Sequence, residues 1–105
     1  MAGLLVLRPD LDWNVSGGLF YWTVEFLADR MSDPEAAAYL REISDENLGS
    51  LWLSELSPSA RAEAVELLRD HLVDAADREL PGGKGKTAVL GLLRELADMA
   101  RRLGQ

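Results

Sequence analysis

The sequence contains no cysteine, one histidine and only two lysines. The absence of thiols excludes disulfide bonds, cysteine-ligated zinc and cysteine nucleophiles. Long apolar runs are also missing, because Leu4–Leu7 and Leu19–Trp22 hold only four apolar residues each, far from the ~20 that span a bilayer. No basic stretch precedes Leu4–Leu7, so no secretory signal is visible. We therefore expect a cytoplasmic protein with no membrane partner.

Basic residues are scarce in the first half of the chain. Residues 1–60 contain three arginines against ten carboxylates, whereas the remaining residues carry eight basic and eight acidic groups. The whole net charge of −7 therefore belongs to the first half. Such a field repels phosphate backbones, so nucleic acid is not an expected partner, and it attracts a basic protein. The alternative is that the acidic residues only keep the protein soluble.

The composition fits one globular domain covering residues 1–105. Of these residues 48% are hydrophobic, and a chain of this length buries roughly 65% of its unfolded surface, enough for a core without metals or cross-links. The apolar run Leu4–Leu7 has the character of a strand, but a single strand has no partner in sight. We therefore predict that residues 1–18 form an irregular, extended arm, with Trp13 as its anchor.

Helical periodicity dominates after residue 16 and predicts an all-α fold, a small bundle of four to five helices. Ser57 before Pro58 is typical of a helix start, as are Ser32 and Asp33 before Pro34. Gly49 and the alternation of Leu51 and Leu53 fit the third of the expected helices less well. The expected helices cover residues 19–31, 34–43, 46–55, 58–80 and 87–103, with a flexible loop at 81–86.

Residues 83–87, Gly-Lys-Gly-Lys-Thr, end like a phosphate-binding loop that leads into a helix. That motif needs a further glycine five positions before Gly85, where this chain has Leu80, and it needs a preceding strand. Here a long helix is expected instead. The segment is therefore predicted to be a loop with Thr87 as a helix cap, and no cofactor is expected.

Metal binding and catalysis have little support in the sequence. His71 and Asp74 have a spacing that places both on one face of a helix, but a single histidine cannot supply the paired Glu-x-x-His sites of di-iron bundles. The serines at positions 54, 57 and 59 fit turns and caps better than nucleophiles. We expect no catalytic residue, no resident metal and no enzyme activity, and a metal-dependent enzyme using His71 remains the minor alternative.

All five tryptophan and tyrosine side chains fall in the acidic half. Filling the core is their ordinary role, and binding a partner protein is the alternative, since Trp and Tyr are favoured at interfaces. Trp13 and Trp52 are predicted to be partly exposed, because each lies in or beside an irregular stretch. The five residues are Trp13, Tyr21, Trp22, Tyr39 and Trp52.

These observations favour a non-enzymatic acidic module that binds a basic protein partner. In size and charge the chain is similar to bacterial immunity proteins, which block a toxin by covering it, although no motif identifies that family. The second hypothesis is a small regulatory or structural protein that forms a homodimer. The preference for arginine over lysine, with many alanines, indicates a GC-rich bacterial source. The expected partner-binding residues are Asp10, Asp12, Trp13, Glu25, Asp29, Glu42, Asp45, Glu46 and Trp52.

Overall fold

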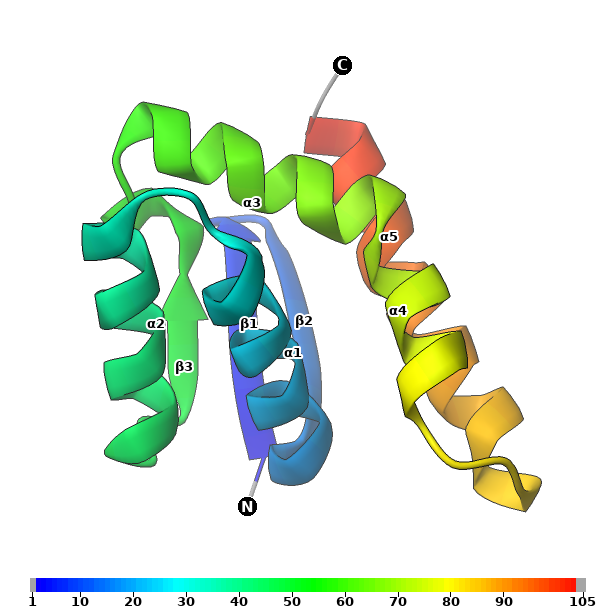
Figure 1. Cartoon of the computed structure of the whole chain (residues 1–105). Helices are drawn as coiled ribbons and strands as arrows, with labels where there is room; N and C mark the ends of the chain where they lie inside the picture. The colour runs from blue at the N-terminus through cyan, green and yellow to red at the C-terminus, as the bar shows by residue number, and fades with distance from the viewer. Residues whose placement is uncertain (1, 104–105) are drawn as a thin grey trace.

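The structure is a computed structural model that describes residues 2–103, without the side chain of Lys84. It combines five α-helices with a three-stranded sheet (Figure 1), so the predicted all-α fold is wrong and the fold is α+β. The error has two origins. Strand β3 (Ser50–Trp52) has only three residues, too few to show a strand pattern, whereas the alternation of apolar and polar residues over Leu11–Ser16 was a strand signal that the prediction overlooked.

The first 18 residues contain a β-hairpin rather than the irregular arm that we predicted. Strand β1 (Ala2–Arg8) pairs antiparallel with β2 (Leu11–Ser16). Buried and exposed residues alternate along β2, which is the period of a strand with one face on the core. The partner that the run Leu4–Leu7 lacked in the sequence analysis is therefore the segment directly after it.

The third strand replaces most of the helix that we predicted over residues 46–55. The chain turns at Asn47, where φ is 53°, and then forms β3 (Ser50–Trp52) and the short 3₁₀ helix η1 (Leu53–Glu55). Strand β3 runs parallel to β1, with Leu5 opposite Leu51, and the strand order is β2-β1-β3. Leu51 in β3 and Leu53 at the start of η1 are both fully buried, so their alternation reflects the end of a strand followed by a short 3₁₀ helix rather than an α-helix.

The helices mostly begin where the sequence indicates. Side chains of Ser16, Asp33 and Ser57 cap the first three, which confirms the predicted start at Ser57–Pro58. The single helix predicted over 58–80 is wrong, because the chain forms two helices that are separated at His71, where φ is −124°. The last helix begins at Lys84, so the expected loop at 81–86 shortens to 81–83. The helices are α1 (Gly17–Arg30), α2 (Pro34–Asp45), α3 (Pro58–Asp70), α4 (Leu72–Glu79) and α5 (Lys84–Leu103).

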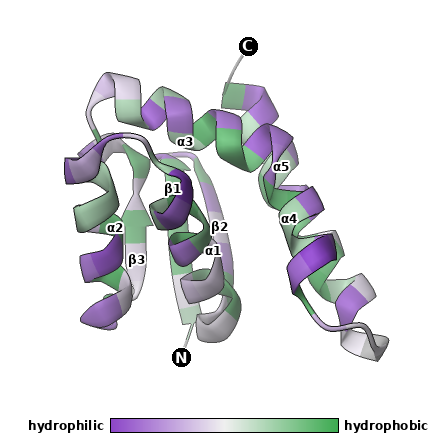
Figure 2. Cartoon of the chain, in the orientation of Figure 1, coloured by the Kyte–Doolittle hydropathy of each residue, from purple (hydrophilic) through white to green (hydrophobic). Residues whose placement is uncertain are grey.

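No helix in the described part of the chain is both long and apolar enough to cross a membrane. The helices instead turn their apolar sides inward, as the hydropathy colouring of Figure 2 shows for α3 to α5. Leu68, Leu72 and Leu93 are fully buried in one core with residues of α1 and the sheet. Helices and sheet therefore share a single hydrophobic core.

The sheet contributes only one of its faces to that core. Leu5, Trp13 and Leu51 belong to the core cluster, whereas Leu4 and Val6, which point to the opposite face, do not. Helices α1 and α2 lie in front of the sheet in the view of Figure 1. Because successive residues of a strand point to opposite faces, β1 divides the molecule into a helical side and an outer sheet face.

Helix α1 lies very close to the central strand at Gly3. A Cβ atom at Gly3 would lie 2.2 Å from the Cβ and Cγ atoms of Phe20, which is fully buried. No side chain larger than hydrogen fits there without moving α1. Gly3 therefore sets the distance between helix and sheet.

Replacing Gly3 by alanine should lower the free energy of unfolding by about 1–3 kcal/mol, because Phe20 or the α1 backbone must move. Gly91→Ala is the matched control, since a Cβ at that position in α5 would have no described atom within 4 Å apart from its chain neighbours and the nearby backbone of its own helix. The control should raise stability by about 0.5–1 kcal/mol through helix propensity. Urea unfolding measures both. Equal stability of the two variants would contradict the close approach of Phe20 to β1.

Candidate protein-binding surface

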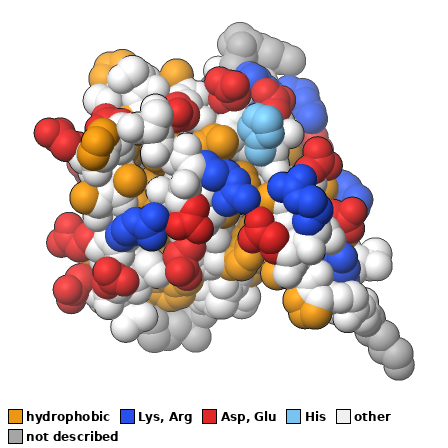
Figure 3. Space-filling model, viewed as in Figure 1, with side chains coloured by type: hydrophobic (Ala, Val, Ile, Leu, Met, Phe, Trp, Pro, Cys, Tyr) orange, Lys and Arg blue, Asp and Glu red, His pale blue; other side chains and the backbone are white. Residues whose placement is uncertain are grey.

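Exposed carboxylates gather on the helical side, over α1, α2 and η1. The space-filling view shows acidic side chains over α2 and the adjoining part of α1, at the left of Figure 3. Helices α1 and α2 pack directly against each other, so their outward faces form one surface. We call this set the acidic surface. Its members are Glu25, Asp29, Glu35, Glu42, Asp45, Glu46 and Glu55, all exposed.

The three arginines of residues 1–60 neutralise little of this charge. Arg8 pairs with Asp10 at 2.9 Å and Arg41 pairs with Asp29 at 2.9 Å. The third, Arg30, pairs with Glu79 of α4 at 3.0 Å. Of the acidic surface, only Asp29 has an ion-pair partner among the described side chains.

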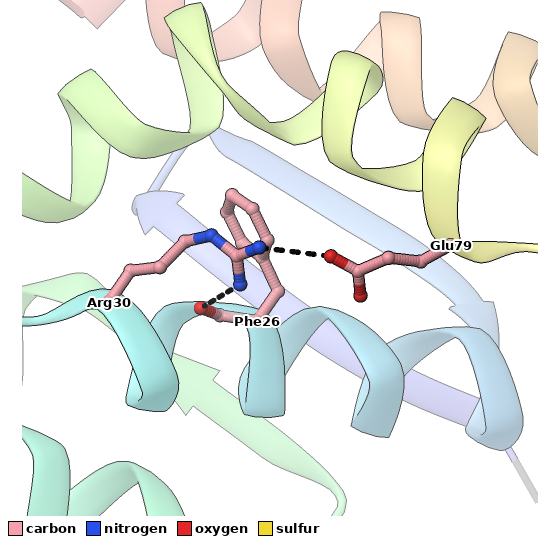
Figure 4. A network of polar contacts seen from close by, with 3 residues as sticks. All are labelled: Phe26, Arg30 and Glu79. Atoms are coloured by element: carbon pink, nitrogen blue, oxygen red, sulfur yellow. Dashed lines mark hydrogen bonds and ion pairs between the residues drawn. The ribbon is translucent and has the colours of Figure 1, made fainter.

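Arg30 joins α1 to α4 instead of shielding the carboxylates (Figure 4). One guanidinium nitrogen donates to the backbone oxygen of Phe26 at 3.3 Å and another to Oε2 of Glu79 at 3.0 Å. The guanidinium carbon lies 4.3 Å from the centre of the Phe26 ring, a cation–π distance. Arg30 of the acidic half is therefore paired at the surface with a carboxylate of the second half.

A small acidic hollow lies where α2 meets η1 and the start of α3. It has a volume of about 220 Å³, and its charged lining residues are Asp33, Glu35 and Glu55. Partial burial raises the pKa of Tyr39 in its wall, and the negative charges of Glu55 and Glu42 raise it further. Glu35 of α2 and Glu55 of η1 both line this hollow, so these two elements adjoin in the acidic surface.

The nine residues expected to bind a partner do not form one patch. Glu25, Asp29, Glu42, Asp45 and Glu46 lie on the acidic surface. Asp10 is exposed in the hairpin turn, and Asp12 and Trp52 point to the outer sheet face. Trp13 lies in the core.

The two tryptophans predicted to be partly exposed have opposite environments. Trp52 is 41% exposed, as predicted, but Trp13 is only 2% exposed, so the prediction for Trp13 is wrong. Its indole Nε1 donates to the backbone oxygen of Leu92 at 3.0 Å and ties the hairpin to α5. Burial follows from strand alternation, because position 13 lies on the same face as Leu11 and Val15.

Leu48 was missed as a surface residue. It is 45% exposed, close to Trp52 in the chain, and its backbone oxygen accepts a hydrogen bond from the Tyr21 hydroxyl. Asp33, Glu35 and Glu55 were also left out of the expected site. For Glu55 the signal in the sequence was the run from Glu42 to Ala60, which has four acidic residues and no basic one, whereas Asp33 and Glu35 lie outside that run.

The remaining candidate chemistry lies elsewhere and stays separate from the acidic surface. His71 is exposed at the break between α3 and α4, and no group of three or more His, Asp or Glu side chains in the described chain is placed to hold a metal ion. The segment that resembles a phosphate loop follows α4, a helix, and Lys86 donates to the backbone oxygen of Asp77 at 2.8 Å. A mostly apolar groove of about 520 Å³ lies beside it, between Leu19, Trp22 and Val89.

Comparisons with known proteins add no family to this geometry. No protein-family model, curated protein or solved structure matches the chain. The function is therefore inferred from the surface alone.

The two tryptophans should respond differently to substitution. Trp13→Phe should lower the free energy of unfolding by about 1–3 kcal/mol, because it removes a partly buried hydrogen bond and leaves a cavity. Trp52→Phe, an exposed control, should change it by less than about 0.5 kcal/mol. Chemical unfolding followed by circular dichroism measures both. A Trp13→Phe variant as stable as the native chain would contradict the role of Trp13 in joining the hairpin to α5.

The raised pKa of Tyr39 should be visible in an ultraviolet pH titration of a Tyr21→Phe variant, in which Tyr39 is the one tyrosine. Adding Glu55→Gln should lower the pKa of Tyr39, since a charge that disfavours the phenolate is removed. Because the folded pKa lies above the unfolded one, the stability that Tyr39 contributes is complete below the unfolded value and is lost as the pH rises through the folded value. An unchanged titration after Glu55→Gln would contradict an effect of the Glu55 charge on the Tyr39 hydroxyl.

Proposed function

We propose that the protein is a non-enzymatic binding module that presents its acidic surface to a basic protein. The observation that carries the proposal is the near absence of ion-pair partners for this surface, since Arg30 is used on Glu79 and Arg41 pairs with Asp29 alone. An unneutralised acidic surface accelerates encounter with a positively charged partner and disfavours other partners. A cytoplasmic location is part of the proposal.

The position of the charge supports binding more than solubility alone. Charge that serves only solubility is distributed around the whole surface, with both signs interspersed. In this chain both signs are mixed on α3 to α5, where Arg69 pairs with Asp70 and Arg101 pairs with Asp98. On α1, α2 and η1 the excess is acidic. A protein that covers the basic surface of an enzyme, as immunity proteins do, is one role that suits this arrangement.

Charge reversal tests the proposal. Glu25→Lys, Glu42→Lys and Glu46→Lys together should slow association with the partner about tenfold at low salt, because electrostatic steering is removed. The immobilised chain is first used to capture proteins from extract of the source cells, and each captured basic protein is then measured by surface plasmon resonance. Raised salt should slow association of the native chain in the same direction.

A matched control removes the same charge from another part of the surface. Glu66→Lys, Asp74→Lys and Glu95→Lys gives the same net charge from exposed residues of α3, α4 and α5, and none of the three forms an ion pair with a described side chain. This control should keep the partner and most of its association rate. If no captured basic protein distinguishes the two variants, the proposed function is refuted.

A further inference from the structure

Strand β3 is a sheet edge with no strand beside it on its outer side. It ends the order β2-β1-β3, and its one paired neighbour in the described chain is β1. An edge strand exposes unpaired backbone N–H and C=O groups, to which another extended chain can pair. Edge β2, by contrast, is held against α5 through Trp13.

The direction of the unpaired groups follows from the register. Leu4 donates its backbone N–H to the oxygen of Gly49 at 2.9 Å, so Gly49 and Leu51 turn their backbone groups toward β1. In a strand the intervening residues turn the other way. The N–H and C=O groups of Ser50 and Trp52 therefore point to the outer edge.

Exposed apolar side chains flank this edge. The described chain has three large hydrophobic residues that are exposed, and two of them, Leu48 at 45% and Trp52 at 41%, lie at β3. Trp52 shares a row with Val6 and Asp12 across the outer sheet face. Backbone groups for pairing, an aromatic side chain and a carboxylate thus occur within one small region.

Charge selects the occupant. From Glu42 to Ala60, the segment that contains β3, the chain carries four carboxylates and no basic side chain. A second copy paired through β3 would bring two such acidic segments together, and like charges at close distance disfavour that pairing. An extended segment rich in lysine or arginine has the complementary charge, and its cations can also lie over the Trp52 ring.

We propose that an extended basic segment of the partner protein adds to the outer edge of β3 as a fourth strand. This inference rests on the proposed function, because it specifies where a basic partner attaches. Main-chain hydrogen bonds to Ser50 and Trp52 supply the pairing, while Leu48 and Trp52 supply apolar contact. The carboxylates of α2 and η1 orient the segment.

The test uses a synthetic probe and does not need the natural partner. A capped heptapeptide of alternating lysine and valine is titrated into the isotopically labelled full chain, and backbone amide chemical shifts are followed. Shifts should be largest at Leu48, Ser50 and Trp52. A heptapeptide of alternating glutamate and valine, with the same apolar content, should produce none.

Two variants separate strand pairing from simple charge attraction. Ser50→Pro removes an outward N–H and should weaken binding of the lysine peptide about tenfold, whereas Ser50→Ala keeps that N–H and should stay within about twofold. Trp52→Ala should also weaken binding about tenfold, and it keeps the test decisive if Ser50→Pro does not fold.

Three results would overturn the inference. They are the absence of shifts at β3, equal binding of the lysine and glutamate peptides, or binding that neither Ser50→Pro nor Trp52→Ala weakens. If the lysine peptide instead shifts only residues of α1 and α2, the site on β3 is refuted while the acidic surface keeps its proposed role. Failure of the proposed function is read separately, from the captured proteins and the charge reversals.

Discussion

The fold depends on satisfying the backbone hydrogen bonds of one central strand. Strand β1 pairs with β2 on one side and with β3 on the other, and the two partners lie at very different distances along the chain. The two strands of the hairpin are neighbours in the sequence. Helices α1 and α2 separate β3 from them along the chain. Because a buried strand with unpaired backbone groups is costly, the position of β3 follows from the need to complete β1.

Helix packing follows from the same strand. Gly3 lets α1 lie directly on β1, and Trp13, opposite Leu5 in the hairpin, reaches the backbone of α5. The core face of the sheet is thereby covered by helices from both halves of the chain. Arg30 reinforces this arrangement by linking α1 to Glu79. Because Arg30 pairs with Glu79, it forms no ion pair with a carboxylate of the acidic surface among the described side chains.

The charge pattern and several helices were readable from the sequence for a plain reason. Net charge over residues 1–60 is a sum that no folding can alter, and cap residues such as Ser57 act on backbone groups within their own turn. The strands were read less well. The alternation of apolar and polar residues over Leu11–Ser16 predicts a strand, and interpreting residues 1–18 as an irregular arm overlooked it. Leu4–Leu7 was recognised as apolar and extended, but β3 has three residues, too few for any periodicity to show. The helical spacing of apolar residues continues across residues 58–80, so the sequence pattern did not indicate the break at His71.

The sequence by itself determined that the chain would be largely helical, free of thiol chemistry and acidic in its first half, because these properties follow from composition and local backbone preferences. Only the tertiary structure decided which tryptophan is buried, which carboxylates the arginines pair with and which strands lie at the edges of the sheet. Those features depend on contacts between residues far apart in the chain, such as Trp13 with Leu92 and Arg30 with Glu79. Local propensity carries no information about such pairs.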